Sequence, residues 1–164
     1  MIDYSVIEKV MNLVKEKHLH ISAAESCTGG LVSASVVHET GASDVFCEGY
    51  VTYSNEAKHR ILGVSEETLR TRGAVSEETA REMANGLHHV TGAEICITTT
   101  GIAGPGGETE EKPVGLVYIG IYVLGKIVVI KHIFKGNRTE VREQAVNAAF
   151  LKVMELISKS NCNA

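Results

Sequence analysis

The chain has no tryptophan, only two prolines, few aromatic residues and no excess of basic charge. Its 164 residues carry a formal net charge of −4, so they offer no broad positive field for the backbone of nucleic acid. No apolar run approaches the length of a membrane span, and the first residues lack the basic and apolar segments of a secretory signal. These absences predict a globular cytoplasmic protein that binds neither nucleic acid nor membrane.

CxxC pairs are absent as well. The four cysteines, Cys27, Cys47, Cys96 and Cys162, are widely spaced along the chain. This spacing argues against a zinc site and against a redox motif. We therefore expect buried or tolerated thiols and no bound metal.

What the chain does have is an alternation of helical and strand periodicity. Two Ser-Glu-Glu-Thr segments, at 65–68 and 76–79, are interpreted as helix starts, because serine caps free amides and glutamate suits the positive end of a helix dipole. The pattern predicts a helix over 4–17, a strand over 19–24, a helix from 31 to about 41, a strand over 45–54, helices from about 55 (with Asn55 as cap), 65 and 76, a strand over 94–100, a hairpin over 115–134 and a helix over 139–158.

This order of elements predicts an α/β fold, a three-layer sandwich in which helices flank a mixed β-sheet, built as a single domain over residues 1–164. In such folds ligands gather at the carboxyl ends of strands. Three loops, at 25–30, 52–58 and 100–107, are therefore expected to meet at one site.

The first of these loops lies in AAESCTGG, residues 23–30. Ser26 and Thr28 follow a strand, and Gly29 and Gly30 open a helix, so free amides could face a phosphate or the oxyanion of an acyl transfer. The segment matches neither a Walker motif nor a dinucleotide fingerprint. By spacing alone, a simple cap with tight packing explains it equally well.

The second loop places Tyr53 at a strand end and Lys58 on the next helix. A serine nucleophile needs a base, and lysine can serve if burial lowers its pKa. By position alone, Lys58 also fits an ordinary solvated helix residue.

The third loop combines Thr100, Gly101 and Gly104 with further glycines and a proline. Glycines allow close approach of a ligand to the backbone, but a flexible surface loop has the same composition. Arg138 and Arg142, four residues apart on the last helix, fit either a phosphate clamp or a solvated face.

Five segments together closely resemble the C-terminal domain of the competence-damage-inducible protein CinA, a family that includes nicotinamide-nucleotide amidohydrolases. They are AAESCTGG at 23–30, GYVTYSNEAKHRILGV at 49–64, GAVSEETAREMA at 73–84, TTTGIAGPGG at 98–107 and EEKPVGLVYIGI at 110–121. The likeness runs from about residue 5 to 157. It implies an α/β fold and hydrolysis of the carboxamide of nicotinamide mononucleotide, giving nicotinate mononucleotide and ammonia in pyridine-nucleotide recycling, without a cofactor.

The resemblance also implies a serine/lysine dyad, with Ser26 as nucleophile, Lys58 as its base and Tyr53 beside them. Cys27 is the rival nucleophile, but consecutive residues after a strand point to opposite sides, so we expect only Ser26 to reach the ligand. Substrate contacts are expected from Glu25, Thr28, Gly29, Gly30, Thr100, Gly101, Gly104 and Arg142.

Several points stay open at this stage. The phosphate could bind the loop 101–107, the turn 28–30 or Arg142, and either Tyr50 or Tyr53 could face the cationic pyridinium. A catalytically silent nucleotide-binding or regulatory module is the alternative function. We expect a homo-oligomer, because the apolar hairpin and the alanine-rich last helix could pack against a second subunit.

Overall fold

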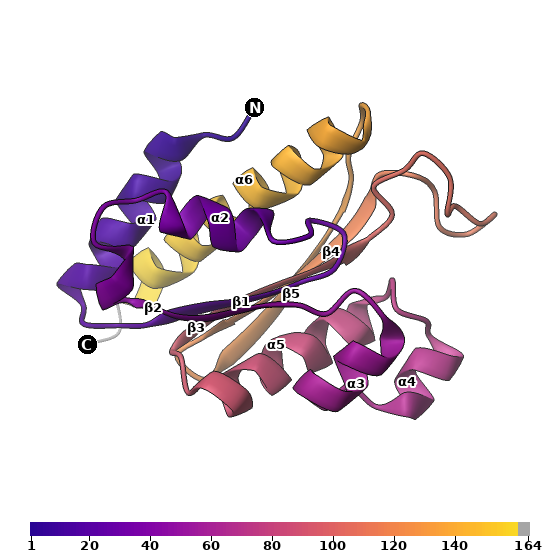
Figure 1. Ribbon diagram of the computed structural model, residues 1–164, viewed down its shortest axis with the longest axis horizontal. Helices are drawn as coiled ribbons and strands as arrows, with labels where there is room; N and C mark the ends of the chain where they lie inside the picture. Colours follow the sequence, from indigo (N-terminus) through magenta and orange to yellow (C-terminus); the bar gives the residue numbers. More distant parts are fainter. Residues whose placement is uncertain (161–164) are drawn as a thin grey trace.

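A five-stranded mixed β-sheet lies between two layers of helices (Figure 1). The computed structural model describes residues 1–160. The strand order is β2-β1-β3-β4-β5, in which β1 (Ile21–Glu25) is parallel to both β2 (Phe46–Val51) and β3 (Ile95–Gly101). The hairpin of β4 (Leu116–Val123) and β5 (Lys126–Ile133) extends the sheet in antiparallel fashion. The predicted α/β sandwich is confirmed.

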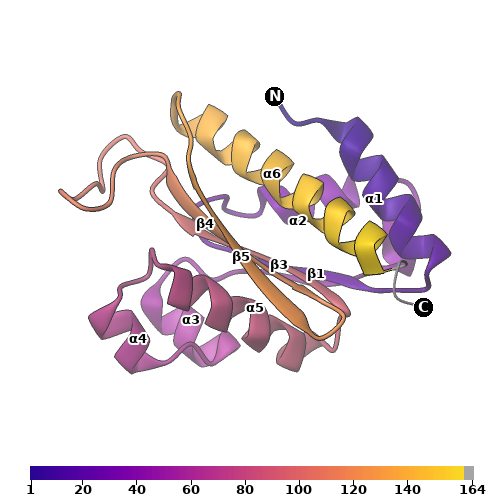
Figure 2. The same ribbon diagram turned by 180° about the vertical axis from the view of Figure 1, so that it is seen from behind.

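The helices divide between the two faces of the sheet. Figures 1 and 2 show α1 (Tyr4–Glu16), α2 (Leu31–Val37) and α6 (Arg138–Lys159) on one face, and α3 (Asn55–Leu62), α4 (Glu66–Thr71) and α5 (Glu77–Thr91) on the other. A short 3-10 turn, η1 (Ala42–Asp44), precedes β2. Each face has its own apolar core, the larger one beneath α1, α2 and α6. Among the described residues, no helix combines the length and apolar character needed to cross a membrane.

Serine residues start the helices of the second layer. The side chains of Ser65 and Ser76 each accept a hydrogen bond from the amide three residues ahead, as the Ser-Glu-Glu-Thr pattern predicts. At α3 the cap is Ser54, whose backbone is extended and whose hydroxyl accepts from Ala57. Asn55 is already helical, so the prediction of Asn55 as the cap was wrong by one residue.

The first strand also begins later than the pattern predicts. Residues 17–19 complete the end of α1, since the Leu19 amide donates to the Val14 carbonyl and His18 adopts a left-handed backbone with φ of 53°. The strand therefore starts at Ile21 instead of residue 19.

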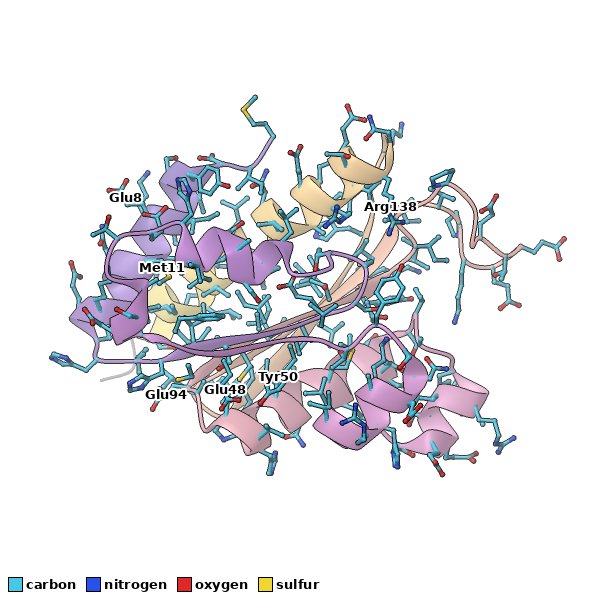
Figure 3. The ribbon with its side chains drawn as sticks, in the orientation of Figure 1. Glu8, Met11, Glu48, Tyr50, Glu94 and Arg138 are labelled. Carbon is cyan, nitrogen blue, oxygen red and sulfur yellow. The ribbon has the colours of Figure 1, made fainter. Side chains whose placement is uncertain are left out.

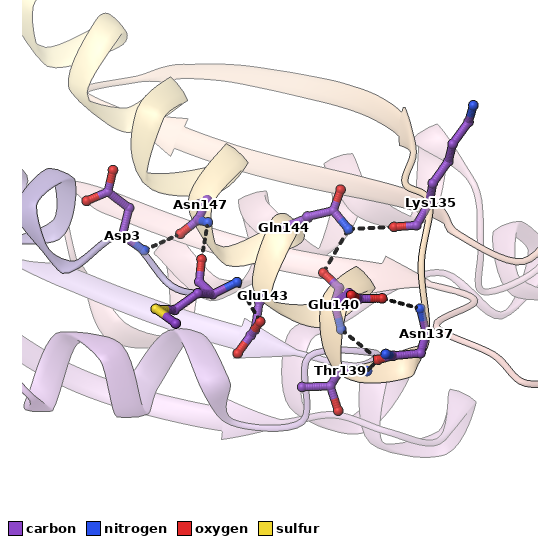
Figure 4. Close-up of polar contacts among 9 residues, drawn as sticks. Asp3, Lys135, Asn137, Thr139, Glu140, Glu143, Gln144 and Asn147 are labelled. Atoms are coloured by element: carbon purple, nitrogen blue, oxygen red, sulfur yellow. Dashed lines mark hydrogen bonds and ion pairs between the residues drawn. The ribbon is translucent and has the colours of Figure 1, made fainter.

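The first residues of the chain are fastened to the last helix (Figure 4). The amino group of Met1 forms an ion pair of 2.8 Å with Glu143. Asn147 accepts from the Asp3 amide at 2.8 Å and donates to the Met1 carbonyl at 3.0 Å. The same helix begins with a capping box, in which Asn137 and Glu140 satisfy each other's amides.

The connections around β1 determine where a site can form. From β1 the chain passes through α2 to β2 on one side, and from β2 it returns through α3, α4 and α5 to β3 on the other side. The two crossovers run on opposite faces of the sheet (Figure 1). A crevice is expected where such connections diverge, at the carboxyl end of β1. Ser26 is the first residue beyond that end.

Candidate active site

Ser26 and Lys58 meet at the carboxyl end of β1. Ser26 continues the strand, with its amide bonded to the Thr99 carbonyl of β3 at 3.0 Å. Lys58 comes from the first turns of α3, which begins just after β2. Its Nζ lies 3.1 Å from the Ser26 Oγ. The predicted pair is therefore within direct hydrogen-bond reach.

The Lys58 side chain is almost completely removed from solvent, with 1% of its surface exposed. Within residues 1–160 its amine is hydrogen-bonded to the Ser26 hydroxyl and to the carbonyls of Thr52 and Tyr53, none of which carries a formal charge. Burying an ammonium group among neutral partners disfavours its charged form. Burial accordingly lowers the pKa of Lys58 below its ordinary value of 10.5.

The two carbonyls also orient the amine. The Thr52 carbonyl accepts from Nζ at 2.9 Å, and the Tyr53 carbonyl at 3.4 Å. A neutral amine has two N–H groups and one lone pair. When both N–H groups donate to these carbonyls, the lone pair is the group left to accept the Ser26 proton.

Cys27 points to the opposite face of the sheet from Ser26, as alternation predicts. Its side chain belongs to the apolar core beneath α1, α2 and α6, with 6% of its surface exposed. Burial raises the pKa of the Cys27 thiol to about 11. The thiol is therefore protonated at neutral pH. Cys96 is likewise buried and Cys47 is exposed, whereas Cys162 lies outside the described residues.

Glu25 differs from its predicted role as a substrate contact. The residue is completely buried. Its carboxylate accepts hydrogen bonds from the Thr28 hydroxyl, the amides of Gly30, Val32 and Ser33, and the Ser33 hydroxyl. Both oxygens are thus occupied by the turn and the first residues of α2.

The amides of the turn are only partly available to a ligand. Gly29 donates to the Ser26 carbonyl at 3.1 Å, and Gly30 donates to Glu25 at 3.1 Å. Among the described residues, no acceptor receives the amides of Cys27 and Thr28. In this turn the two glycine amides are therefore occupied, whereas those of Cys27 and Thr28 remain without an acceptor among the described residues.

The two arginines of α6 hold loops of the site in place. Arg142 donates from Nε and Nη2 to the Thr28 carbonyl, at 3.1 and 2.6 Å. Arg138, labelled at the start of α6 in Figure 3, donates to the Gly104 carbonyl at 2.9 Å. Both side chains therefore fasten a loop to α6. The sequence had suggested either a phosphate clamp or a solvated helix face for this pair, and neither interpretation includes this role.

The three predicted contacts at the end of β3 and in the loop after it shape the local backbone. The Thr100 hydroxyl donates to the Ala74 carbonyl at 2.6 Å. A Cβ on Gly101 would lie 2.6 Å from the Leu116 carbonyl oxygen, so no larger residue fits the strand there. Gly104 has φ of 71°, which favours glycine. This loop follows β3 at the end of the sheet where Ser26 follows β1, because the two strands are parallel and Thr99 pairs with Glu25.

The tyrosines lie apart from the dyad's hydroxyl and amine. Tyr53 is 63% exposed, and only its carbonyl contacts Lys58. Tyr50 donates to Glu48, and Figure 3 labels both on the α5 side of the sheet. Tyr50 packs there against the smaller core. Of the two residues proposed to face a pyridinium, Tyr53 alone has a free phenol in the described structure.

A family model for the CinA C-terminal domain matches residues 3–157. The chain belongs to the CinA C-terminal domain family. A CinA-like protein of Kosmotoga olearia is 55% identical over 141 residues, which cover 86% of this chain and 34% of that protein. A CinA-like protein of Fusobacterium nucleatum is 50% identical over 155 residues, covering 94% and 37%. This chain thus spans about a third of the length of the curated CinA relatives it matches.

Solved CinA structures share the whole fold. The competence/damage inducible protein CihA of Agrobacterium tumefaciens superposes with a TM-score of 0.92 at 37% identity, covering 95% of this chain and 98% of that one. A CinA superfamily protein of Klebsiella pneumoniae gives a TM-score of 0.92 at 32% identity, with the same coverage.

Two threonines complete this CinA site and were not singled out from the sequence. The Thr99 hydroxyl lies 2.7 Å from that of Thr28 and joins β3 to the turn. The Thr52 hydroxyl is buried beside the Lys58 anchor and has no partner among the described residues. A threonine at a strand end is an ordinary strand residue in sequence, so only the strand order reveals these contacts.

Proposed function

We propose that this protein hydrolyses the carboxamide of nicotinamide mononucleotide to nicotinate mononucleotide and ammonia. The observation that carries the proposal is the buried Lys58 amine, 3.1 Å from Ser26 and hydrogen-bonded, among the described residues, to uncharged groups. A lysine in such surroundings loses its proton at a lower pH than a solvated lysine, which suits its neutral amine to act as a base. The identity of the substrate rests on the resemblance of the motif segments, because the names of the relatives, a CinA-like protein and a competence/damage inducible protein, state no reaction.

In the first half of the reaction, the neutral Lys58 amine takes the hydroxyl proton of Ser26 while the Ser26 Oγ attacks the amide carbon. The resulting oxyanion is held by the free amides of Cys27 and Thr28. The first of these is the residue after the nucleophile, which supplies an oxyanion donor in other strand-to-turn serine sites. The Lys58 ammonium then protonates the leaving nitrogen, so ammonia departs and the acyl group stays on Ser26.

In the second half, water attacks the acyl-enzyme while Lys58 accepts its proton. The carbonyl–Oγ bond breaks, the acid product leaves, and Lys58 returns the proton to Ser26. We also propose that the exposed Tyr53 ring contacts the pyridinium ring of the bound nucleotide. We further propose that the reaction takes place in the cytoplasm, in a homo-oligomer of this single-domain chain.

The decisive experiment measures ammonia release from nicotinamide mononucleotide by the purified protein. Ser26→Ala and Lys58→Ala should each lower the rate by about 10³-fold or more, because nucleophile and base act as a unit. Cys27→Ala is the matched control and should retain activity, since its thiol faces the opposite core. Binding of the nucleotide without ammonia release by the unaltered protein would move it to the catalytically silent class.

A further inference from the structure

A carboxylate lies directly beneath the turn that carries the nucleophile. Glu25 is the last residue of β1, has no exposed surface, and precedes Ser26 in the chain. Its Oε2 accepts from the Thr28 hydroxyl and the amides of Gly30 and Val32, at 2.6, 3.1 and 2.9 Å. Its Oε1 accepts from the amide and the hydroxyl of Ser33, both at 2.8 Å. One side chain therefore joins the strand end, the turn and the first turn of α2.

The opposite side of the same turn is held from α6. Arg142 donates two hydrogen bonds to the Thr28 carbonyl, and a Cβ on Gly29 would lie 3.5 Å from its Nη2. Thr28 is thus fixed through its hydroxyl by Glu25 and through its carbonyl by Arg142. The two peptide groups whose amides remain without an acceptor, those of Cys27 and Thr28, lie between these anchors.

We propose that Glu25 is a positioning residue, whose buried carboxylate sets the geometry of Ser26 and of the two free amides without touching the substrate. The inference rests on the proposed function, in which those groups act on a carbonyl. It also excludes the start of α2 as the phosphate site, because the Gly30, Val32 and Ser33 amides are already bound to Glu25.

Glu25→Gln is the sharpest variant. It preserves the size of the side chain, but one oxygen becomes an NH2 group that cannot accept a hydrogen bond. A hydroxyl can turn to accept from the NH2 group, but a backbone amide cannot, so the Ser33 amide faces a donor in one orientation and the Gly30 and Val32 amides do so in the other. The turn must shift to relieve this conflict, and a displacement of 1 Å at a reacting group costs about 100-fold in rate.

Two readouts separate this role from others. The first is the rate at which a fluorophosphonate modifies Ser26, which depends on the dyad and the amides but not on the natural substrate. The second is the kcat and KM for ammonia release from nicotinamide mononucleotide. We expect Glu25→Gln to slow labelling and kcat by about 100-fold at an unchanged KM, with a cooperative unfolding transition retained. A KM increase with labelling at the unaltered rate would identify a substrate contact and overturn the proposal.

Glu82→Gln is the matched control. Its carboxylate also binds the start of a helix, accepting from the Ser65 amide at 2.7 Å and the Thr68 hydroxyl at 2.5 Å, but at α4. It should label at the rate of the unaltered protein.

Thr28→Val is a second test, for use if Glu25→Gln does not fold. It removes one of the donors to Glu25 and should slow labelling by about 10-fold. Labelling of this variant at the unaltered rate would contradict the proposal. An unaltered protein that labels readily yet releases no ammonia would refute the amide hydrolysis, while the labelling rates would still decide the role of Glu25.

Discussion

The proposed role of Lys58 as the base makes the proposed hydrolysis depend on pH. Burial lowers its pKa below 10.5, so the neutral base appears at a lower pH than for a solvated lysine. We expect kcat to rise with pH as Lys58 loses its proton, with a midpoint below 10.5. Lys58→Arg keeps a cation at every pH and should be inactive throughout. A rate profile of the unaltered protein that stays flat across this range would contradict the role of Lys58 as the base.

The same residue makes stability depend on pH. Between the lowered folded pKa and the ordinary value of 10.5, the unfolded chain binds the proton and the folded chain does not. The free energy of unfolding therefore rises with pH through this window, and the contribution is lost as pH falls through the folded pKa. Lys58→Met should remove this part of the slope. Urea unfolding of both proteins at a series of pH values measures the difference.

Residues of the site differ in how far they could be predicted. Ser26 directly follows β1, and Lys58 lies on the helix that follows β2. Because β1 and β2 are parallel neighbours, both residues are expected at the same end of the sheet. The contacts of the Glu25 carboxylate depend on how α2 folds back over β1. The spacing of residues in the sequence does not predict this packing. The Arg142 bond to Thr28 spans 114 residues of chain and depends on the packing of α6. The resemblance identified the positions, whereas their hydrogen-bond partners required the fold.

At the scale of elements, the position of α3 decides where Lys58 lies. α3 packs against α5 through Gly86, where a Cβ would approach the Leu62 carbonyl oxygen of α3 to 1.8 Å. Gly86→Ala should therefore push the two helices apart, with a loss of about 1–3 kcal/mol in the free energy of unfolding. Because Lys58 is on α3, kcat should fall as well. Urea unfolding and ammonia release measure the two effects.

The neighbouring Asn85 provides the control for this change. Asn85 lies on the exposed side of α5, so Asn85→Ala introduces no contact with α3. It should leave both the stability and the rate nearly unchanged. A Gly86→Ala protein as stable and as active as Asn85→Ala would show that α3 and α5 can separate without cost to the dyad.

The elements themselves were predicted well because their signals are local. The serine caps of the two Ser-Glu-Glu-Thr segments act within a few residues, so spacing finds them. Ends that depend on neighbouring elements were less accurate. The start of β1 was set by the completion of α1, through the Leu19 amide and the Val14 carbonyl. The strand order β2-β1-β3 likewise depends on which crossover covers which face.

At the scale of the whole molecule, the first residues and the last helix stabilise each other. Asn147 forms two hydrogen bonds, one to the Asp3 amide and one to the Met1 carbonyl. Asn147→Ala should lower the free energy of unfolding by about 1–2 kcal/mol, since two hydrogen bonds are lost. The site residues are untouched, so kcat should not change. A variant of unaltered stability, measured by urea unfolding, would show that this contact contributes nothing.

The bond from Arg142 to the Thr28 carbonyl has a consequence for the order in which the protein matures. Residue 28 leaves the ribosome long before residue 142, and β1 cannot pair with β3 until residue 95 has been made. Long-range contacts of this kind form only after the intervening chain is available. A nascent chain that ends before α6 would therefore carry Ser26 and Lys58 but not the arginine that fastens the nucleophile's turn. Under the proposed mechanism, catalytic competence should appear only in the last stage of synthesis, once α6 has docked on the sheet.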